Sequence, residues 1–330
     1  MNIRNVFGPN DDRLHAPGDS HYETETFWYS LVVPERRMGG WIYASVRQNA
    51  GVTAGGMWLW DDSSPHPPDA PFYEYFAHLK LPTQHEPACL AFPTGMRIEV
   101  HEPLMIYGIA YDDRNRMSAQ LQFKALEPPV PLPTGEPPYP KAQHFDQTGH
   151  VTGTITLDGE PIPVDCFAMR DRSWGPRPER GYRRVGYTWA AGPAVSLLSY
   201  TAPAGDGEER IYCGYLRRET TLSRIVNGVR RVKRHPVEGW VTAITVDAET
   251  EDGERVRGQA RGLSRLLLSI GNHMCACTLL DWQLDGQRLA GEDQDVWPIP
   301  EWRALRAAGR QRSGNDPTYP SQRSSDDRPE

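Results

Sequence analysis

The stretch VTGTITLDGEPIPVDCFAMR, residues 151–170, carries two β-rich runs on either side of an Asp-Gly pair. Residues 151–157 and 162–170 are each about the length of a strand. Asp158 and Gly159 both tolerate positive φ, as a tight hairpin turn requires. The stretch therefore predicts an antiparallel β-hairpin.

Short β-rich runs also precede and follow this hairpin in the sequence. Four more Asx-Gly pairs separate apolar runs in the second half of the chain: Asp206-Gly207, Asn227-Gly228, Asp252-Gly253 and Asp285-Gly286. No long segment has a 3.6-residue period, and residues 301–308 are the best helix candidate. Strands that follow one another without intervening helices predict an all-β protein built from antiparallel barrels or sandwiches.

A proline-rich segment divides the chain. Residues 126–141 contain seven prolines, which cannot support a strand ladder and favour an extended spacer. We therefore expect a β domain at residues 1–126, a linker at 127–141 and a second β domain at 142–309. The polar residues 310–330 are expected to form a disordered tail.

Composition excludes several classes of function. A net charge of -7 argues against nucleic acid as the main partner. Only four of the 36 basic residues are lysines, which disfavours Schiff-base chemistry, and no Gly-x-Gly-x-x-Gly or Walker loop is present. No apolar run approaches the ~18 residues that span a bilayer, and no signal peptide is visible. Five scattered cysteines fit reduced thiols, so we expect a cytoplasmic protein.

The densest motif is Asp171-Arg172-Ser173-Trp174-Gly175-Pro176-Arg177. Asp171 lies between two arginines, Arg170 and Arg172, whose charge favours the carboxylate. In a pocket, the same group could act as a general acid. Alternatively, Arg172 stacks on a tryptophan to plug a barrel and Asp171 is its structural partner. The residues leave this choice open.

The motif at 171–177 resembles the signature of the AttH-like and carotenoid 1,2-hydratase-like superfamily. Residues 28–31, 39–42, 144–153, 157–160 and 291–294 extend the resemblance over roughly residues 20–305. It is closest to a bacterial branch of domains of unknown function, related to calycin-type Diels–Alderases. The resemblance implies two tandem lipocalin-like barrels, with a pocket in or between them, and chemistry without redox cofactors. It implies that Asp171 is an acid or the organiser of Arg172.

Two further pairs are candidates for acid–base work. His144 and Asp146 follow the proline segment, and histidine is the natural proton shuttle at neutral pH. Glu74 and His78 lie in the aromatic run 72–78. The structural alternative for the first pair is a set of hydrogen bonds where a strand begins.

Aromatic side chains could line an apolar pocket, although many must pack the core. The acidic group at 291–295 is expected to be a solvated turn after the last strand, and we expect no metal and no cofactor. The candidate substrate-binding residues are Trp58, Trp60, Tyr75, Trp174, Tyr187 and Trp189.

These features predict a cofactor-independent lyase that moves a proton on a bulky hydrophobic or aromatic small molecule. It would add or remove water, or cleave a carbon–carbon bond next to a hydroxyl, while Arg172 or a tyrosine stabilises the developing oxyanion. A lignin-like aromatic is one conceivable substrate, and a polyene or steroid is equally admissible. A cyclase of the Diels–Alderase type and a non-catalytic lipophile carrier are the alternatives. The expected partner is the small molecule, with a homodimer allowed and with no nucleic acid or membrane.

Overall fold

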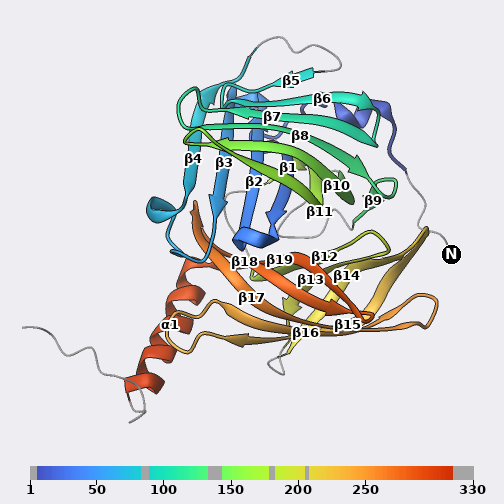
Figure 1. The fold of residues 1–330 in the computed structure, drawn as a ribbon, viewed down its shortest axis with the longest axis vertical. Helices are drawn as coiled ribbons and strands as arrows, with labels where there is room; N and C mark the ends of the chain where they lie inside the picture. Colours follow the sequence, from blue (N-terminus) through green and yellow to red (C-terminus); the bar gives the residue numbers. More distant parts are fainter. Residues whose placement is uncertain (1–5, 83–88, 133–142, 178–182, 205–207, 315–330) are drawn as a thin grey trace, which may run out of the picture.

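The computed structural model describes residues 6–82, 89–132, 143–177, 183–204 and 208–314. It is all-β, as predicted, and consists of a curled sheet and a closed antiparallel barrel (Figure 1). No helix in these ranges has the length and apolar character needed to cross a bilayer.

The curled sheet, here the first sheet, has the strand order β4-β3-β2-β1-β11-β10-β8-β7-β6-β5, with β9 paired to β10. Of the strands described, β4 and β5 do not pair, so the sheet is an open half-barrel. Its strands are β1 (Glu23–Val33), β2 (Met38–Arg47), β3 (Val52–Trp60), β4 (Phe72–Lys80), β5 (Cys89–Ala91), β6 (Met96–Glu102), β7 (Ile106–Asp112), β8 (Met117–Ala125), β9 (Val130–Pro131), β10 (Gln143–Leu157) and β11 (Glu160–Pro176).

The barrel closes in sequence order from β12 to β19, with β12 paired to β19. Helix α1 (Ile299–Gly314) follows it and packs beside β19 through Trp302, whose ring lies 6.1 Å from that of Trp297. The strands are β12 (Val185–Ala191), β13 (Val195–Pro203), β14 (Glu209–Arg218), β15 (Thr221–Arg234), β16 (Val241–Thr250), β17 (Arg255–Ile270), β18 (His273–Leu284) and β19 (Gln287–Pro298).

The predicted hairpin forms, but it belongs to the first unit. β10 and β11 pair over their whole length around Asp158-Gly159, and Asp158 adopts φ 51°. β11 also pairs with β1, and β10 with β8. The expected start of the second domain at residue 142 is therefore wrong: residues 143–176 complete the first sheet, because two long strands pair with β1 and β8 across the proline segment.

The other expected boundaries change less. Part of the proposed linker, 133–141, lies outside the described residues, while Val130–Pro131 pairs with β10. The predicted helix at 301–308 is longer than expected and includes residues 310–314 of the expected tail. Residues 315–330 lie outside the described ranges.

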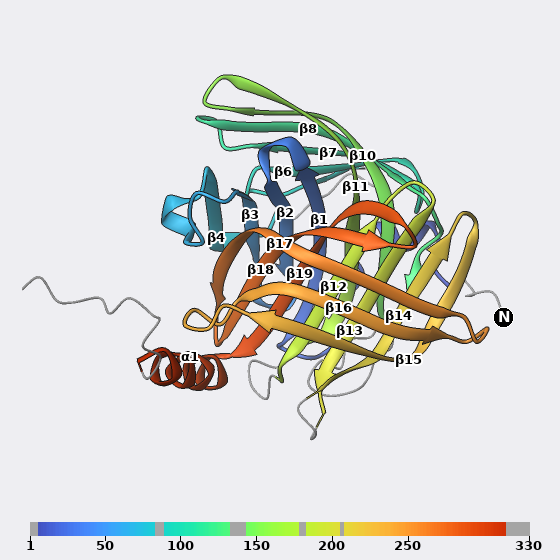
Figure 2. The same cartoon turned by 60° about the horizontal axis from the view of Figure 1, so that its bottom comes forward.

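Strands β1–β3 bury most of the residues on both of their faces. One face lines the inside of the first sheet, and the other packs on the outside of the barrel (Figures 1 and 2). A single hydrophobic core therefore includes Trp28 and Trp41 of the first sheet together with Tyr187 and Leu279 of the barrel. We call this contact between the two units the seam. It places polar residues of β10 and β11 opposite those of the barrel.

Candidate active site

The signature motif on β11 divides its side chains between two faces. Alternate residues of a strand point in opposite directions, so Asp171 and Ser173 share one face and Arg170 and Arg172 the other. Asp171 is paired across the sheet with Trp28 on β1 and with Asp146 on β10. These three residues face the seam.

A histidine and two carboxylates meet there. The Nε2 atom of His144 hydrogen-bonds the Oδ2 atom of Asp171 and lies 3.7 Å from the Oδ2 atom of Asp146. The Asp146 side chain is fully buried and that of His144 is 5% exposed, whereas Asp171 is 19% exposed. Asp171 is thus the member of the group that solvent or a ligand reaches.

Two tyrosines of the barrel complete this group. The Tyr187 hydroxyl donates to Oδ1 of Asp146 at 3.0 Å. The Tyr200 hydroxyl donates to Oδ2 of Asp146 at 3.3 Å and lies 3.3 Å from Nε2 of His144. Burial, reinforced by the nearby Asp146, raises the pKa of both phenols well above its usual value, so both remain donors at neutral pH. We call His144, Asp146, Asp171, Tyr187 and Tyr200 the seam cluster.

A buried acid, Glu127 in the segment that follows β8, lies beside β10 further along the seam. Glu127 accepts hydrogen bonds from the backbone N–H of Thr148 and, at 3.4 Å, from the Tyr215 hydroxyl. Burial raises its pKa to about 7, against the opposing effects of the Thr148 hydrogen bonds and of Arg217. The seam thus contains a buried carboxyl group whose pKa lies near neutrality.

The seam cluster has donors that could bind a divalent cation. One atom from each of His144, Asp146 and Asp171 lies within 4.8 Å of the others. One imidazole and two carboxylates suit several divalent metals. However, both oxygens of Asp146 already accept from phenols, and Nε2 of His144 already bonds Asp171. The same atoms therefore form a hydrogen-bonded acid–base group in this structure.

Arg172 has a structural role on the opposite face. Its guanidinium lies 3.8 Å from the centre of the Phe27 ring and 5.3 Å from that of Trp174, and it pairs with the buried Glu25. Asp171 contacts His144 and not Arg172, so the expectation that Asp171 organises Arg172 is wrong. Trp174 stacks on His15 at 3.8 Å and lies away from the seam cluster.

The second expected acid–base pair does not form at the seam. Glu74 accepts a hydrogen bond from the Tyr111 hydroxyl, and Met57 is its neighbour on β3. His78 is exposed near the end of β4. The contact with Tyr111 places Glu74 on the inner side of the first sheet, and the register of β4 shifts just before His78. Neither residue contacts His144 or Asp171 within the described ranges.

The expected substrate-binding aromatics fall into three groups. Tyr187 belongs to the seam cluster, and its ring lies 5.8 Å from that of Trp28. Trp58, Trp60 and Trp189 are core side chains with at most 2% exposure. Tyr75 is 39% exposed and lies 6.3 Å from Trp58, at the outer edge of the seam.

Sequence reasoning missed Tyr200, Trp28 and Glu292 as residues of the seam. Glu292 was placed in a solvated turn, but residues 291–295 form part of β19. Its carboxyl accepts from the Trp41 indole at 2.9 Å, and burial raises its pKa to about 8. Tyr200 lies near the end of a predicted strand, and nothing in the local sequence indicates that its side chain faces another domain.

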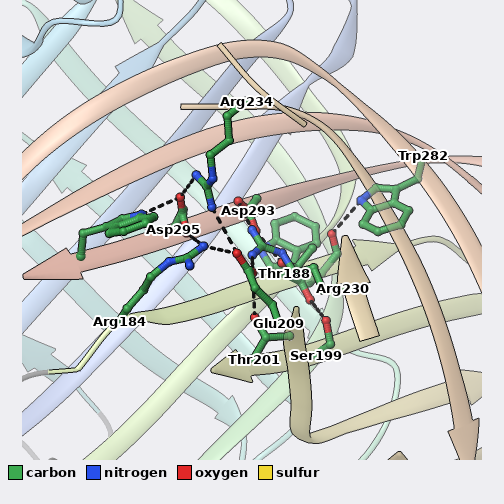
Figure 3. A network of polar contacts seen from close by, with 12 residues as sticks. Arg184, Thr188, Ser199, Thr201, Glu209, Arg230, Arg234, Trp282, Asp293 and Asp295 are labelled. Carbon is green, nitrogen blue, oxygen red and sulfur yellow. Dashed lines mark hydrogen bonds and ion pairs between the residues drawn. The ribbon is translucent and has the colours of Figure 1, made fainter. Parts of the chain in front are cut away.

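The inside of the barrel is filled and charged rather than open. Arg230 bonds both oxygens of Asp293 at 2.6 Å and also binds Glu209, while Arg234 and Arg184 engage Asp295 and Glu209 (Figure 3). Three arginines oppose three carboxylates in this network. Trp282, fully buried, packs with Leu280 and Leu284 in the apolar part of the interior. Both parts are structural, which leaves the seam as the candidate site.

The chain thus combines a curled half-barrel sheet and a closed barrel, with the seam cluster where the two units meet. The chain belongs to the family described as Domain of unknown function (DUF7064), which matches residues 8–292. No curated protein matches the sequence significantly.

Solved structures share the fold at low identity. An AttH-type protein of Nitrosomonas europaea superposes with a TM-score of 0.61 at 13% identity, covering 89% of this chain and 97% of that one. Kievitone hydratase of Nectria haematococca gives 0.55 at 8% identity, covering 90% and 94%. CghA gives 0.55 at 11% identity, covering 84% and 88%. At these identities the likeness establishes the fold alone.

Proposed function

We propose that the protein is an acid–base lyase that acts at the seam on a bulky hydrophobic or aromatic small molecule. The observation that carries this proposal is the position of His144. Its Nε2 atom lies between Asp171, which is accessible, and Asp146, which is fully buried and fixed by two phenols. A histidine held in this way can take up and return a proton without changing its place.

The proton moves between the substrate and the Asp171–His144 pair. In removal of water, the pair takes a proton from carbon and delivers one to the departing hydroxyl, so that a double bond and water result. Addition of water reverses both transfers. In cleavage of a carbon–carbon bond, the pair takes the hydroxyl proton, a carbonyl forms as the bond breaks, and the released carbanion receives the proton. No external oxidant or reductant enters either scheme.

The surroundings of Asp171 favour a flat, hydrophobic substrate. Trp28, its neighbour across the sheet, makes edge-to-face contact with Trp41 at 5.4 Å. Further across the same side of the sheet, on β4, Tyr73 and Tyr75 are 38% and 39% exposed. Aromatic surfaces of this kind hold ring systems and exclude water.

The fold relatives support the class of ligand. Kievitone hydratase is, by its name, a hydratase, and CghA has been solved with the small molecule Sch210972. A hydratase and a small-molecule complex on this fold agree with a lyase at the seam.

The test is an assay of aryl enones and aryl β-hydroxyketones in deuterated, ¹⁸O-labelled water, followed by mass spectrometry and NMR. We expect the wild type to incorporate both labels where it adds water, or deuterium alone into the released fragment where it cleaves a carbon–carbon bond. His144→Gln should incorporate neither label by catalysis. Saturable binding without turnover would instead favour a carrier. Ring formation that persists in His144→Gln would favour a shape-directed cyclase.

A further inference from the structure

Arg177 is the last described residue of the segment that follows β11, and it lies beside the seam cluster. Its backbone N–H bonds the carbonyl of Tyr22 at 2.9 Å, which fixes the start of the side chain. Its Nη2 atom donates to the hydroxyls of Ser173 and, at 3.2 Å, Thr26. Thr26 in turn donates to Oδ1 of Asp171 at 3.4 Å. One threonine hydroxyl thus links Arg177 to the accessible carboxylate.

Arg177 differs from the buried arginines in its partners. Arg172 pairs with Glu25, Arg217 with Glu127 and Arg230 with Asp293. Within the described ranges, Arg177 pairs with no carboxylate. Its hydrogen-bond acceptors there are two neutral hydroxyls. Its Nε atom is buried without a hydrogen-bond acceptor, as are those of Arg172 and Arg230, so the neutral partners are what sets Arg177 apart.

Such a guanidinium has unused binding capacity. It carries a permanent charge and five N–H donors in a planar fork that matches a carboxylate. An incoming anion would give this guanidinium the charged acceptor that its two hydroxyl partners do not provide. The pattern is that of a prepared anion site.

The ring of Tyr43 lies near Arg177, on the same face of the first sheet as Asp171. Tyr43 is paired with Trp28 across the sheet, as is Asp171, so all three share one face. Its ring lies 6.2 Å from that of Trp58. Burial raises the pKa of its hydroxyl to about 12, with Arg177 acting against this shift and Asp171 reinforcing it. An aromatic ring therefore lies near both Arg177 and Asp171 on this face of the sheet.

We propose that Arg177 binds an anionic oxygen of the substrate, and that the substrate is an aryl compound bearing a carboxylate. This inference rests on the proposed function and deepens it. The oxyanion-stabilising role that the sequence suggested for Arg172 falls instead to Arg177. Where proton abstraction next to a carboxylate or carbonyl places negative charge on oxygen, the same guanidinium stabilises that charge.

The test is binding, so that it does not depend on turnover. Benzoate, cinnamate, 4-hydroxycinnamate and indole-3-acetate, each with its methyl ester, are titrated by calorimetry into the full-length protein. We expect at least one acid to bind the wild type at least tenfold more tightly than its ester. Arg177→Gln should lose this preference, and Arg177→Lys should retain part of it because the charge remains but the fork is gone.

Arg116→Gln is the matched control, because Arg116 is exposed and pairs with Asp158 far from the seam. It should bind as the wild type does. The proposal is overturned if no acid binds, if esters bind as well as acids, or if Arg177→Gln keeps the preference while its thermal unfolding matches the wild type.

The same titrations on His144→Gln separate this proposal from the proposed function. We expect that variant to keep the preference for acids while losing turnover. If it keeps turnover as well, the proton-transfer role of His144 is wrong and the anion site stands. If it loses the preference while Arg177 is intact, the anion site is wrong.

Discussion

Asp171 and Arg172 are adjacent in the sequence, yet their side chains lie on opposite faces of β11. Asp171 meets His144 in the seam, and Arg172 pairs with Glu25 over the Phe27 ring inside the first sheet. One motif therefore serves two purposes. Asp171 and Ser173 face the candidate active site, whereas Arg172 and Trp174 pack together on the inner face of the first sheet.

Arg172→Met should destabilise the fold without altering the chemistry. Arg172 and Glu25 are 2% and 5% exposed, and removing one partner of a buried pair costs about 3–5 kcal/mol. Urea unfolding should show this loss, whereas Arg36→Gln, which breaks an exposed pair with Glu160, should leave the unfolding midpoint close to that of the wild type. Turnover per folded molecule should match the wild type. A stable but inactive Arg172→Met would contradict the division of roles.

Tyr200→Phe and Tyr187→Phe should have different effects. Tyr187 contacts Asp146 alone among the acid–base residues, so its loss should cost about 1–3 kcal/mol of stability and leave the pH profile in place. Tyr200 contacts both Asp146 and His144, so its loss should move the pH dependence of turnover. Identical pH–rate profiles for the wild type and Tyr200→Phe would show that Tyr200 does not tune His144.

Glu292 should make stability fall as pH rises. Its pKa is raised from 4.5 to about 8 by burial, so the folded state holds a proton that the unfolded state releases. This contribution is fully present below pH 4.5 and is lost up to about pH 8, at a slope of at most about 1.4 kcal/mol per pH unit. Glu292→Gln should remove this slope in urea titrations between pH 5 and 8.

Glu25 provides the opposite control. Burial alone would raise its pKa, but Arg172 and His15 outweigh burial and lower it. Its contribution is present above pH 4.5 and is lost as pH falls, so Glu25→Gln should flatten the acid side of the curve. A Glu292→Gln curve parallel to that of the wild type between pH 5 and 8 would show that Glu292 is ionised in the folded protein.

Removal of metal should leave the activity unchanged. The atoms that could bind a cation at His144, Asp146 and Asp171 already form hydrogen bonds with one another and with two phenols. Dialysis against EDTA, followed by the labelling assay, should give the same turnover as before. Loss of turnover that zinc or manganese restores would identify the seam cluster as a metal site.

The sequence was sufficient for the class of fold because its signals are local. Alternating runs and the Asp158-Gly159 turn predict antiparallel strands, and the hairpin β10–β11 confirms this. The domain boundary was wrong because it depends on a distant pairing. β11 joins β1 through Trp28 and Asp171, which are 143 positions apart, and no local pattern encodes that choice.

The same limit applies to the candidate site. Asp171, His144 and Asp146 could be selected by their chemistry, since each lies in a conspicuous polar motif. Tyr200 could not, because it enters the site only when the outside of the barrel packs on the first sheet. Arg177 ends the signature motif, but its lack of a carboxylate partner among the described residues appears only in three dimensions.

The most direct test of the central claim is the turnover of Asp171→Asn in the labelling assay, on a compound that the wild type converts. Asparagine keeps the size of the side chain and removes its ability to accept a proton. With an unchanged unfolding midpoint, we predict a loss of at least about 100-fold, in line with the contribution of a positioned acid–base group. A folded Asp171→Asn that converts the compound at the wild-type rate would contradict the account.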